Sequence, residues 1–399
     1  MLGVLTKHNI ELKKFFGSFL VSMLIVSQCL FGISEFLIGT TMPIKILLIA
    51  GALLGFFCFD KKFTIKHFGV FFIIFSFFLL TFLVNNNTSL EDLFVSFIIY
   101  GCGAFIFSFC EIDEVSVFRF CVFFGFAWLF LFLIKNHFDV SNTFTFGYTL
   151  LPAVIASYLL LISKRDRIII FIIRLVLFLG LSFFLITSGS RGPVFCFIFF
   201  LFIHYLPCVK NWKKAIVYVS ILIVFIVLLV NITAIVTFIH DSIPGKISFI
   251  EKTYNLLTRS EGVSNGRFEI IAEIFSEYKF TDFIFGIGIG SYNSTHLEEG
   301  YTHNLILSVV LDFGVIGLVF IALIACLFFI HLFTEKKNNN YFELLFAVSF
   351  VSLFFSGNYW KYFTFWLLAF LMINASDYMF VSDEVDNQLS SGALRSSNA

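Results

Sequence analysis

Long apolar runs recur along the whole chain, and they limit its possible folds more than any other feature. Hydrophobic residues make up 59% of the 399 residues and charged residues only 13%, whereas a soluble domain contains about 25% charged residues. A helix needs about 20 mostly apolar residues to cross the hydrocarbon core of a bilayer. The pattern therefore predicts an all-α polytopic membrane protein.

About twelve of these runs are candidates for transmembrane helices. The first run has no small-residue cleavage site after it, so we expect a retained span rather than a signal peptide. The predicted spans are residues 15–37, 44–59, 68–84, 93–110, 117–134, 147–163, 168–187, 193–207, 215–239, 303–331, 341–356 and 361–375.

The spans divide the chain into four parts. Transmembrane helices 1–9 occupy residues 1–239, and one large polar loop follows at 240–302. Transmembrane helices 10–12 occupy residues 303–375. The polar, Ser-rich tail at 376–399 is expected to be disordered.

The basic residues of the short loops predict the orientation, because Lys and Arg concentrate on the cytoplasmic side. One side has far more of them and is therefore assigned to the cytoplasm together with both termini. Its basic residues are Lys7, Lys13, Lys14, Lys61, Lys62, Lys66, Lys164, Arg165, Arg167, Lys210, Lys213, Lys214, Lys336 and Lys337. The short loops of the other side contain Lys45, Lys135, Arg191 and Lys361. The turn at 187–192 and the large loop then share the outer side.

Charge and cysteine content exclude several functions. The net charge is zero, so no basic surface points to nucleic acid. None of the eight cysteines lies in the large loop, and there is no CxxC pair or Cys/His cluster of the kind that binds a metal.

Within the loop, residues 264–279 fit one amphipathic helix that Ser264 or Asn265 can cap. Arg267 lies in its first turn, where backbone N–H groups favour anions. On spacing alone, a solvated surface charge is the favoured interpretation of Arg267. The apolar face is predicted to contain Phe268, Ile271, Ile274 or Phe275, and Tyr278, and the polar face Glu269, Glu273 and Glu277.

Two further motifs follow this helix. The alternating glycines of Gly286-Ile287-Gly288-Ile289-Gly290 allow a tight turn and close approach of the backbone to a ligand. The sequence Tyr301-Thr302-His303-Asn304 then opens the tenth predicted span. A histidine has an ordinary pKa of about 6.5, so His303 could act as a general base at neutral pH. At a membrane surface it is also often a plain interfacial residue.

Two charged residues lie inside predicted spans. Asp312 is in the tenth span and Arg174 in the seventh. Intramembrane charges are costly and are usually paired or functional. Structural pairing is favoured over catalysis for both, and an ion pair between them is one possibility.

These motifs together resemble the O-antigen polymerase and O-antigen ligase superfamily. The spacing His303-Asn304, nine residues, Gly314, two residues, Gly317 is similar to its signature. Ser190-Arg191-Gly192 resembles its Ser-Arg-Gly turn, and the segment from Gly266-Arg267 to the glycine turn resembles its periplasmic loop. The resemblance covers about residues 180–320 and implies a GT-C-like fold in the bacterial inner membrane.

The resemblance also implies a chemistry. The enzyme would be a glycosyltransferase that uses a glycan on undecaprenyl pyrophosphate, without metal or cofactor. Arg191 and Arg267 would bind the pyrophosphate, since the guanidinium fork pairs bidentately with phosphate, and His303 would act on the acceptor hydroxyl. A chain-length regulator protein is a possible partner. Further contacts to the substrate are expected from Asn304, Tyr301, Ser190, Gly288 and Arg259.

Three functions remain open at this stage. A polymerase transfers the growing glycan to the next lipid-linked repeat unit, and a ligase transfers it to lipid A-core. We favour the polymerase, partly because nine acidic and five basic residues between 241 and 301 form no strongly basic surface for a phosphorylated core. A polysaccharide or lipid-linked oligosaccharide transporter also suits twelve spans, but it has less need of a large outer loop.

Overall fold

The computed structural model describes the greater part of the chain. The described residues are 2–55, 65–84, 97–135, 144–163, 168–187, 191–206, 216, 220, 237, 241, 267–290, 292, 302, 304–334, 340–355, 357 and 359–373. Within these ranges every element is a helix and there is no strand, as the composition predicts. The predicted ninth span, most of the large loop and the C-terminal tail lie outside them.

The first half of the chain forms a helical bundle with few polar groups. Its α-helices α7 and α8 pack along each other, and α8 contacts both α9 and α10. The helices are α1 (Leu2–Ile25), α2 (Ser27–Ile38), α3 (Met42–Gly55), α4 (Ile65–Val84), the π-helical segment η2 (Phe97–Cys102), α6 (Gly103–Phe107), α7 (Glu114–Lys135), α8 (Phe144–Ile162), α9 (Ile168–Thr187) and α10 (Arg191–Tyr205).

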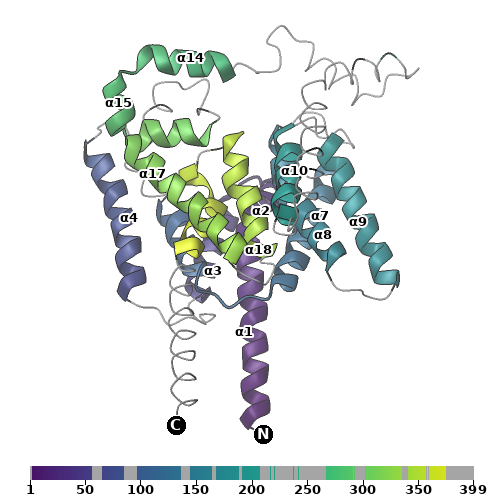
Figure 1. Ribbon diagram of the computed structural model, residues 1–399. Coiled ribbons are helices and arrows are strands. Elements are labelled where there is room, and N and C mark those ends of the chain that lie inside the picture. Colours follow the sequence, from purple (N-terminus) through teal and green to yellow (C-terminus); the bar gives the residue numbers. More distant parts are fainter. Residues whose placement is uncertain are drawn as a thin grey trace, which may run out of the picture.

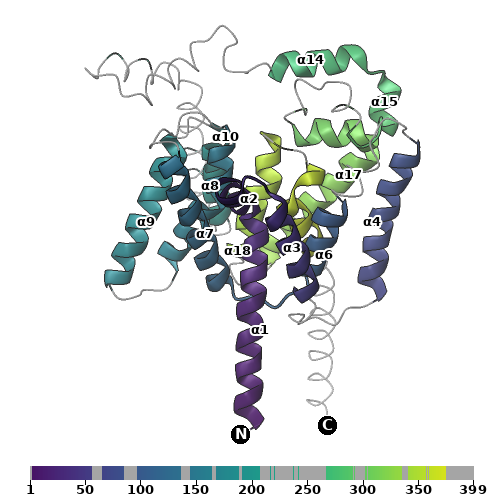
Figure 2. The ribbon, with the colours of Figure 1, turned by 180° about the vertical axis from the view of Figure 1, so that it is seen from behind.

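The second half adds the part of the loop that the structure describes and the last apolar helices. Helices α14 and α15 lie above one end of the bundle, and α17 connects them to its interior (Figures 1 and 2). The elements are α14 (Arg267–Glu277), α15 (Phe280–Phe285), α17 (Leu305–Thr334), α18 (Asn340–Leu345), η5 (Phe346–Val351), η6 (Ser352–Phe354), η7 (Tyr359–Lys361) and a C-terminal helix (Phe363–Ile373).

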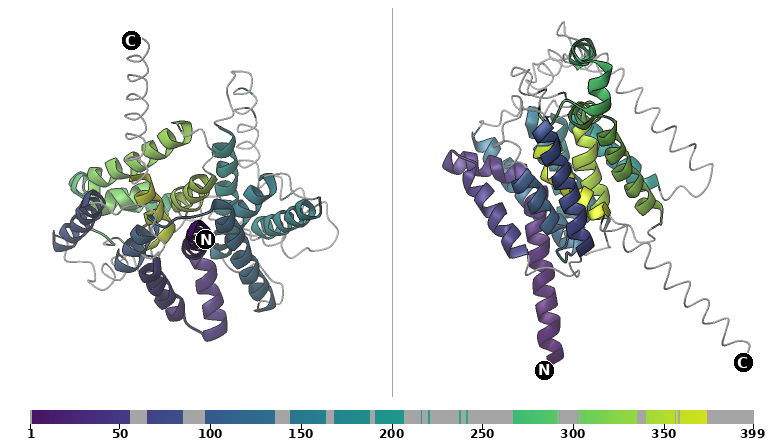
Figure 3. Two further views of the ribbon diagram at one scale, coloured as in Figure 1. Left: turned by 90° about the horizontal axis from the view of Figure 1, so that it is seen from below. Right: turned by 90° about the vertical axis from the view of Figure 1, so that its left-hand side faces the viewer.

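The arrangement of exposed side chains fits a protein surrounded by lipid. Viewed from below, α4 and α9 lie at opposite edges of the bundle (Figure 3). Helix α9 exposes a run of large apolar side chains from Ile168 to Ile173, whose contact with water would be unfavourable. The core lies instead between α1, α7, α8 and the C-terminal helix, where Trp366 and Phe146 are fully buried.

Three helices among the described residues are long and apolar enough to cross a membrane. They are Glu114–Ile134, Ile168–Ile186 and Leu305–Thr334, and α1 with α2 makes a fourth if that bent pair is one span. Several shorter apolar helices accompany them. The count of twelve spans stays a prediction.

The first predicted span, 15–37, is bent rather than straight. The chain bends by 75° between the segments Glu11–Ile25 and Ser27–Ile38. Hydropathy could not reveal this bend, because both segments are apolar and the residue between them, Val26, is also apolar.

The tenth predicted span, 303–331, is also interrupted. Gly314 has φ 64° and ψ −149°, which breaks α17 into a short first arm and a longer second arm. The two arms run in different directions, with the first arm beneath α14 and α15 (Figure 1). Only glycine adopts such backbone angles readily, so this residue determines where the helix changes direction.

Candidate functional site

Both arginines predicted to act on the substrate are the first residues of helices. Arg191 begins α10 and Arg267 begins α14. The two helix starts lie at the same end of the bundle, opposite the N-terminus of α1 (Figures 1 and 2). The first N–H groups of a helix have no partner within it and carry partial positive charge. Each arginine therefore adds its fixed charge to a backbone that already favours anions.

The remaining predicted residues divide between described and undescribed positions. Gly288 and Asn304 are described, and Arg191 and Arg267 are described through their backbone. His303, Tyr301, Ser190 and Arg259 lie outside the described residues, as do the predicted caps Ser264 and Asn265.

The start of α10 packs tightly against α8 and η6. A Cβ atom on Gly192 would overlap the hydroxyl of Tyr148 and would lie 2.7 Å from Cζ of the same ring. It would also lie 3.2 Å from Cβ of Phe355, whose ring packs against that of Phe195. Glycine after Arg191 therefore allows this close packing, which gives the glycine of the Ser-Arg-Gly turn a structural explanation.

A carboxylate organises the junction between the loop and the bundle. Asp312, at the end of the first arm of α17, accepts a hydrogen bond from the Gly290 N–H at 3.1 Å through Oδ1. Its Oδ2 accepts a hydrogen bond from the Tyr359 hydroxyl at 2.6 Å. The main-chain carbonyls of Leu311 and Asp312 accept bonds from the N–H groups of Ile287 (2.6 Å) and Gly288 (3.2 Å). We call residues 286–290 the glycine turn, and it is thus bonded to α17 by three hydrogen bonds.

The glycines of this junction allow two backbones to touch. A Cβ atom on Gly286 would lie 2.6 Å from the Asp312 carbonyl oxygen, and one on Gly314 would overlap the Ile284 carbonyl. A Cβ atom on Gly317 would lie 2.6 Å from Cγ1 of Val309, across the break in α17. The spacing Gly314, two residues, Gly317 therefore has a packing explanation.

A small apolar cluster fixes α14 to the first arm of α17. Ile270, Ile274, Tyr292 and Leu311 are buried together. Of the predicted apolar face of the loop helix, Ile271 is only partly buried and its neighbour Ile270 is the buried residue, while the side chain of Phe268 lies outside those described. The alternative between Ile274 and Phe275 is decided for Ile274, because Phe275 is 63% exposed. Ile274 and the partly buried Tyr278 fit the prediction, and Glu273 and Glu277 are exposed as predicted. The spacing identified a helix, but the buried face depends on what covers it.

The first residues of α17 hold its N-terminus. Asn304 Oδ1 accepts a hydrogen bond from the Leu307 N–H at 3.2 Å, so this side chain caps the helix. Thr302, which is buried, bonds to the Asn304 carbonyl at 3.1 Å and to the Ser308 hydroxyl at 2.5 Å. These contacts fix the two neighbours of His303 in the chain.

The suggested ion pair between Arg174 and Asp312 is wrong. Asp312 bonds to Gly290 and Tyr359, and Arg174 donates to the Leu160 carbonyl at 2.8 Å. Sequence reasoning missed Tyr359, which is 3% exposed. Burial raises the pKa of its hydroxyl well above the usual value, and the Asp312 charge raises it further, so the hydroxyl stays a donor. A tyrosine beside Trp360 and Lys361 in a short loop gives no signal of this role.

A second buried pair joins two helices of the bundle. His204 Nδ1 and Glu343 Oε2 lie 2.7 Å apart, between α10 and α18, and both side chains are buried. The sequence offered a weak signal for this pair, since each residue lies near the end of a predicted span. The pair fixes the end of α10 opposite Arg191.

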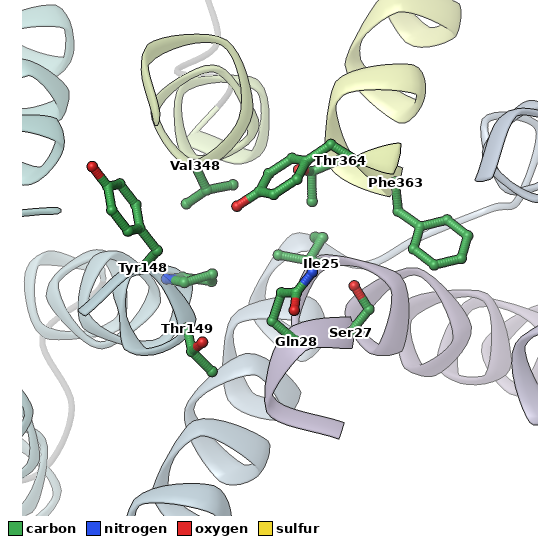
Figure 4. A pocket seen from close by; sticks show the side chains of 10 residues that line it. Ile25, Ser27, Gln28, Tyr148, Thr149, Val348, Phe363 and Thr364 are labelled. Atoms are coloured by element: carbon green, nitrogen blue, oxygen red, sulfur yellow. The ribbon is translucent and has the colours of Figure 1, made fainter. Parts of the chain in front are cut away.

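A pocket lined by polar and apolar side chains, none of them charged, lies where α1 bends into α2. Figure 4 shows Tyr148 and Thr149 from α8, Ser27 and Gln28 from the start of α2, and Thr364 around it. The Thr364 hydroxyl is buried and has no hydrogen-bond partner among the described atoms. Because Tyr148 also contacts Gly192, the pocket is next to the start of α10. Among the described residues, no three His, Cys, Asp or Glu side chains form a group that could hold a metal ion.

The fold and these contacts define an all-helical membrane protein in which a polar loop is fastened over one end of the bundle. Residues 175–322 match the family described as O-antigen ligase. The match supports the O-antigen polymerase and ligase superfamily for this chain and confirms the resemblance that the motifs indicated. It includes both arginines, the glycine turn, His303 and Asp312, whereas Tyr148 and Tyr359 lie beyond it. No curated protein has a significant match to the chain.

Proposed function

We propose that the protein is an O-antigen polymerase of the bacterial inner membrane. It transfers a growing glycan from undecaprenyl pyrophosphate to a sugar hydroxyl of the next lipid-linked repeat unit at the periplasmic face. The observation that carries the proposal is the family match over 175–322, a segment that contains both helix starts with an arginine as first residue. The loop 240–302 and both helix starts are assigned to the periplasmic side, and the two termini to the cytoplasm.

In this proposal the two arginines bind the pyrophosphate of the donor. Arg191 and Arg267 each present a planar, permanently charged guanidinium group, which suits a pyrophosphate better than a lysine would. The free N–H groups at the starts of α10 and α14 provide further donors. As the bond to the sugar breaks, negative charge develops on the leaving oxygen, and these groups stabilise it.

His303 acts on the acceptor. Its imidazole takes the proton from a sugar hydroxyl while the hydroxyl oxygen attacks the anomeric carbon. The bond between that carbon and the pyrophosphate oxygen breaks, and undecaprenyl pyrophosphate leaves with the electron pair. Attack opposite the leaving group inverts the anomeric configuration. Pyrophosphate is already a good leaving group, so this scheme needs no metal ion.

The charge of the loop favours a polymerase over a ligase. Between residues 241 and 301 there are nine acidic and five basic residues, a balance unlike that of a surface for a phosphorylated lipid core. In a polymerase the acceptor is a lipid-linked repeat unit, and its sugars need no such basic surface.

The test uses the purified full-length protein in detergent with lipid-linked repeat units. Lengthening of the glycan without another protein supports the polymerase. Transfer only after addition of lipid A-core establishes a ligase, and movement of substrate across liposomes without transfer establishes a transporter. Products that retain the donor's configuration, or loss of activity with a chelator, would contradict the mechanism. His303→Ala is expected to abolish lengthening while the protein stays folded, and full activity in this variant would exclude His303 as the base.

A further inference from the structure

We infer that Asp312 is a positioning residue that fastens the glycine turn to the membrane bundle, and that Tyr359 is its partner. This inference rests on the proposed function only where it concerns the rate of transfer. Its structural part, the fastening of the loop, stands on the contacts of the described residues.

Asp312 forms three hydrogen bonds in two directions. Its Oδ1 and its main-chain carbonyl accept the N–H groups of Gly290 and Gly288, at 3.1 and 3.2 Å. Its Oδ2 accepts the Tyr359 hydroxyl at 2.6 Å. Gly288 and Gly290 belong to the loop, whereas Tyr359 lies in the connection between the last two apolar segments. One side chain therefore joins the loop to the bundle.

The surroundings of the carboxylate indicate fastening rather than chemistry. Asp312 is 5% exposed and Tyr359 is 3% exposed. Each carboxylate oxygen already accepts a hydrogen bond from a donor of the protein itself. Close backbone packing at Gly286 and Gly314 fills the space beside it. A sugar hydroxyl would have to displace these groups to reach the carboxylate.

The glycine turn connects the two parts of the loop that carry the proposed machinery. It directly follows α15, which is preceded by α14 with Arg267 at its start. It is bonded to the arm of α17 that begins just after His303. Release of the turn would let α14 and the start of α17 move relative to the bundle and to Arg191. Misplacement by about 1 Å can cost roughly 100-fold in rate.

Three substitutions separate positioning from acid–base chemistry. In Asp312→Asn, Oδ1 can still accept the Gly290 N–H, and the amide can donate to the Tyr359 oxygen once that hydroxyl turns. This variant should keep kcat within about threefold, since the number of hydrogen bonds is unchanged. Asp312→Ala loses both contacts, and we expect a loss of at least about tenfold in kcat. Tyr359→Phe loses one contact, and its kcat should lie between those of Asp312→Asn and Asp312→Ala.

The structural readout is hydrogen exchange of the amides of residues 286–290 in the full-length protein. Asp312→Ala should speed exchange at Gly288 and Gly290, and Asp312→Asn should leave it close to that of the unmodified protein. Asp113→Ala is the matched control, because Asp113 also accepts a backbone N–H, that of Ser116 at 2.9 Å, but at the start of α7. It should change neither exchange in the glycine turn nor transfer.

The outcomes distinguish this inference from the proposed function. If Asp312→Asn is as inactive as Asp312→Ala, or shifts the pH profile of kcat, Asp312 is a chemical group and the inference is wrong. Unchanged exchange in both Asp312→Ala and Tyr359→Phe would equally overturn it. If the protein proves to be a ligase and exchange is still faster in Asp312→Ala, the role of Asp312 in holding the glycine turn is supported. Only the assignment as a polymerase is then rejected.

Discussion

The hydroxyl of Tyr148 fills the space that a side chain at Gly192 would need. The contact joins the second turn of α8 to the first turn of α10, one residue after Arg191. Tyr148, which is distant in the sequence, thus packs against the backbone next to Arg191, the residue proposed to bind pyrophosphate. Neither Tyr148 nor Gly192 carries a charge.

Gly192→Ala should therefore impair transfer without unfolding the protein. The nearest atoms to the added methyl group belong to the end of the Tyr148 side chain, so the side chain or the helix start must shift. We expect a loss of about 10- to 100-fold in kcat, because small displacements at a reaction site are costly. Tyr148→Leu in the same protein removes the obstacle and should restore part of the rate. Gly180→Ala is the control, since no atom lies within 4 Å of a Cβ there. Full activity of Gly192→Ala would separate this turn from the site.

The backbone break in α17 leads to a prediction about stability. Gly314→Ala combines an unfavourable backbone conformation with overlap of the Ile284 carbonyl. We expect a cost of about 2–5 kcal/mol, the sum of the strain and the overpacking. Gly39 also has a positive φ of 76° but no neighbour within 4 Å, so Gly39→Ala should cost only about 1–2 kcal/mol. Thermal unfolding in detergent measures both. Equal costs would mean that the close contact between the end of α15 and Gly314 adds nothing to the cost of the backbone strain.

These glycines show what local sequence patterns can and cannot predict. The run of apolar residues predicts that α17 exists and where it ends, and the spacing of Ile274 and Tyr278 predicts α14. The break at Gly314 is invisible in hydropathy, because glycine is common inside membrane helices. It becomes necessary only when residues 284–286 of the loop lie against it.

The same limit applies to the candidate site. Arg267 was identified in the first turn of a predicted helix and Arg191 in the Ser-Arg-Gly turn, and each is the first residue of a helix. The partner of Asp312 was not identified, since Tyr359 is 47 residues away and pairs with it through tertiary contact alone. The sequence offered Arg174 as one possible partner, because both charges lie inside predicted spans, but sequence position within a span does not show which helices are neighbours.

The buried pair of His204 and Glu343 should matter for stability. Glu343→Ala leaves the His204 ring without its partner at 2.7 Å, and we expect a loss of about 1–3 kcal/mol. The double variant His204→Phe with Glu343→Leu replaces both groups by apolar ones and should regain most of this stability. The measurement is the thermal unfolding midpoint of the three proteins in one detergent. A double variant less stable than Glu343→Ala would show that the polar contact itself is needed.

The pyrophosphate assignment predicts how the arginines respond to substitution. Inorganic pyrophosphate should inhibit transfer by competing with the lipid-linked donor. Arg267→Ala should weaken this inhibition about 10- to 100-fold, since a hydrogen bond to a charged group contributes about 1.5–3 kcal/mol. In Arg267→Lys the inhibition should lie between that of the unmodified protein and that of Arg267→Ala, because lysine keeps the charge but loses the bidentate fork. The same substitutions at Arg191 should have the same effects. Arg119→Ala, at an exposed position in α7, is the control for removal of one positive charge. If all three alanine variants weaken inhibition equally, the effect is general electrostatics, and the two helix starts are not the pyrophosphate site.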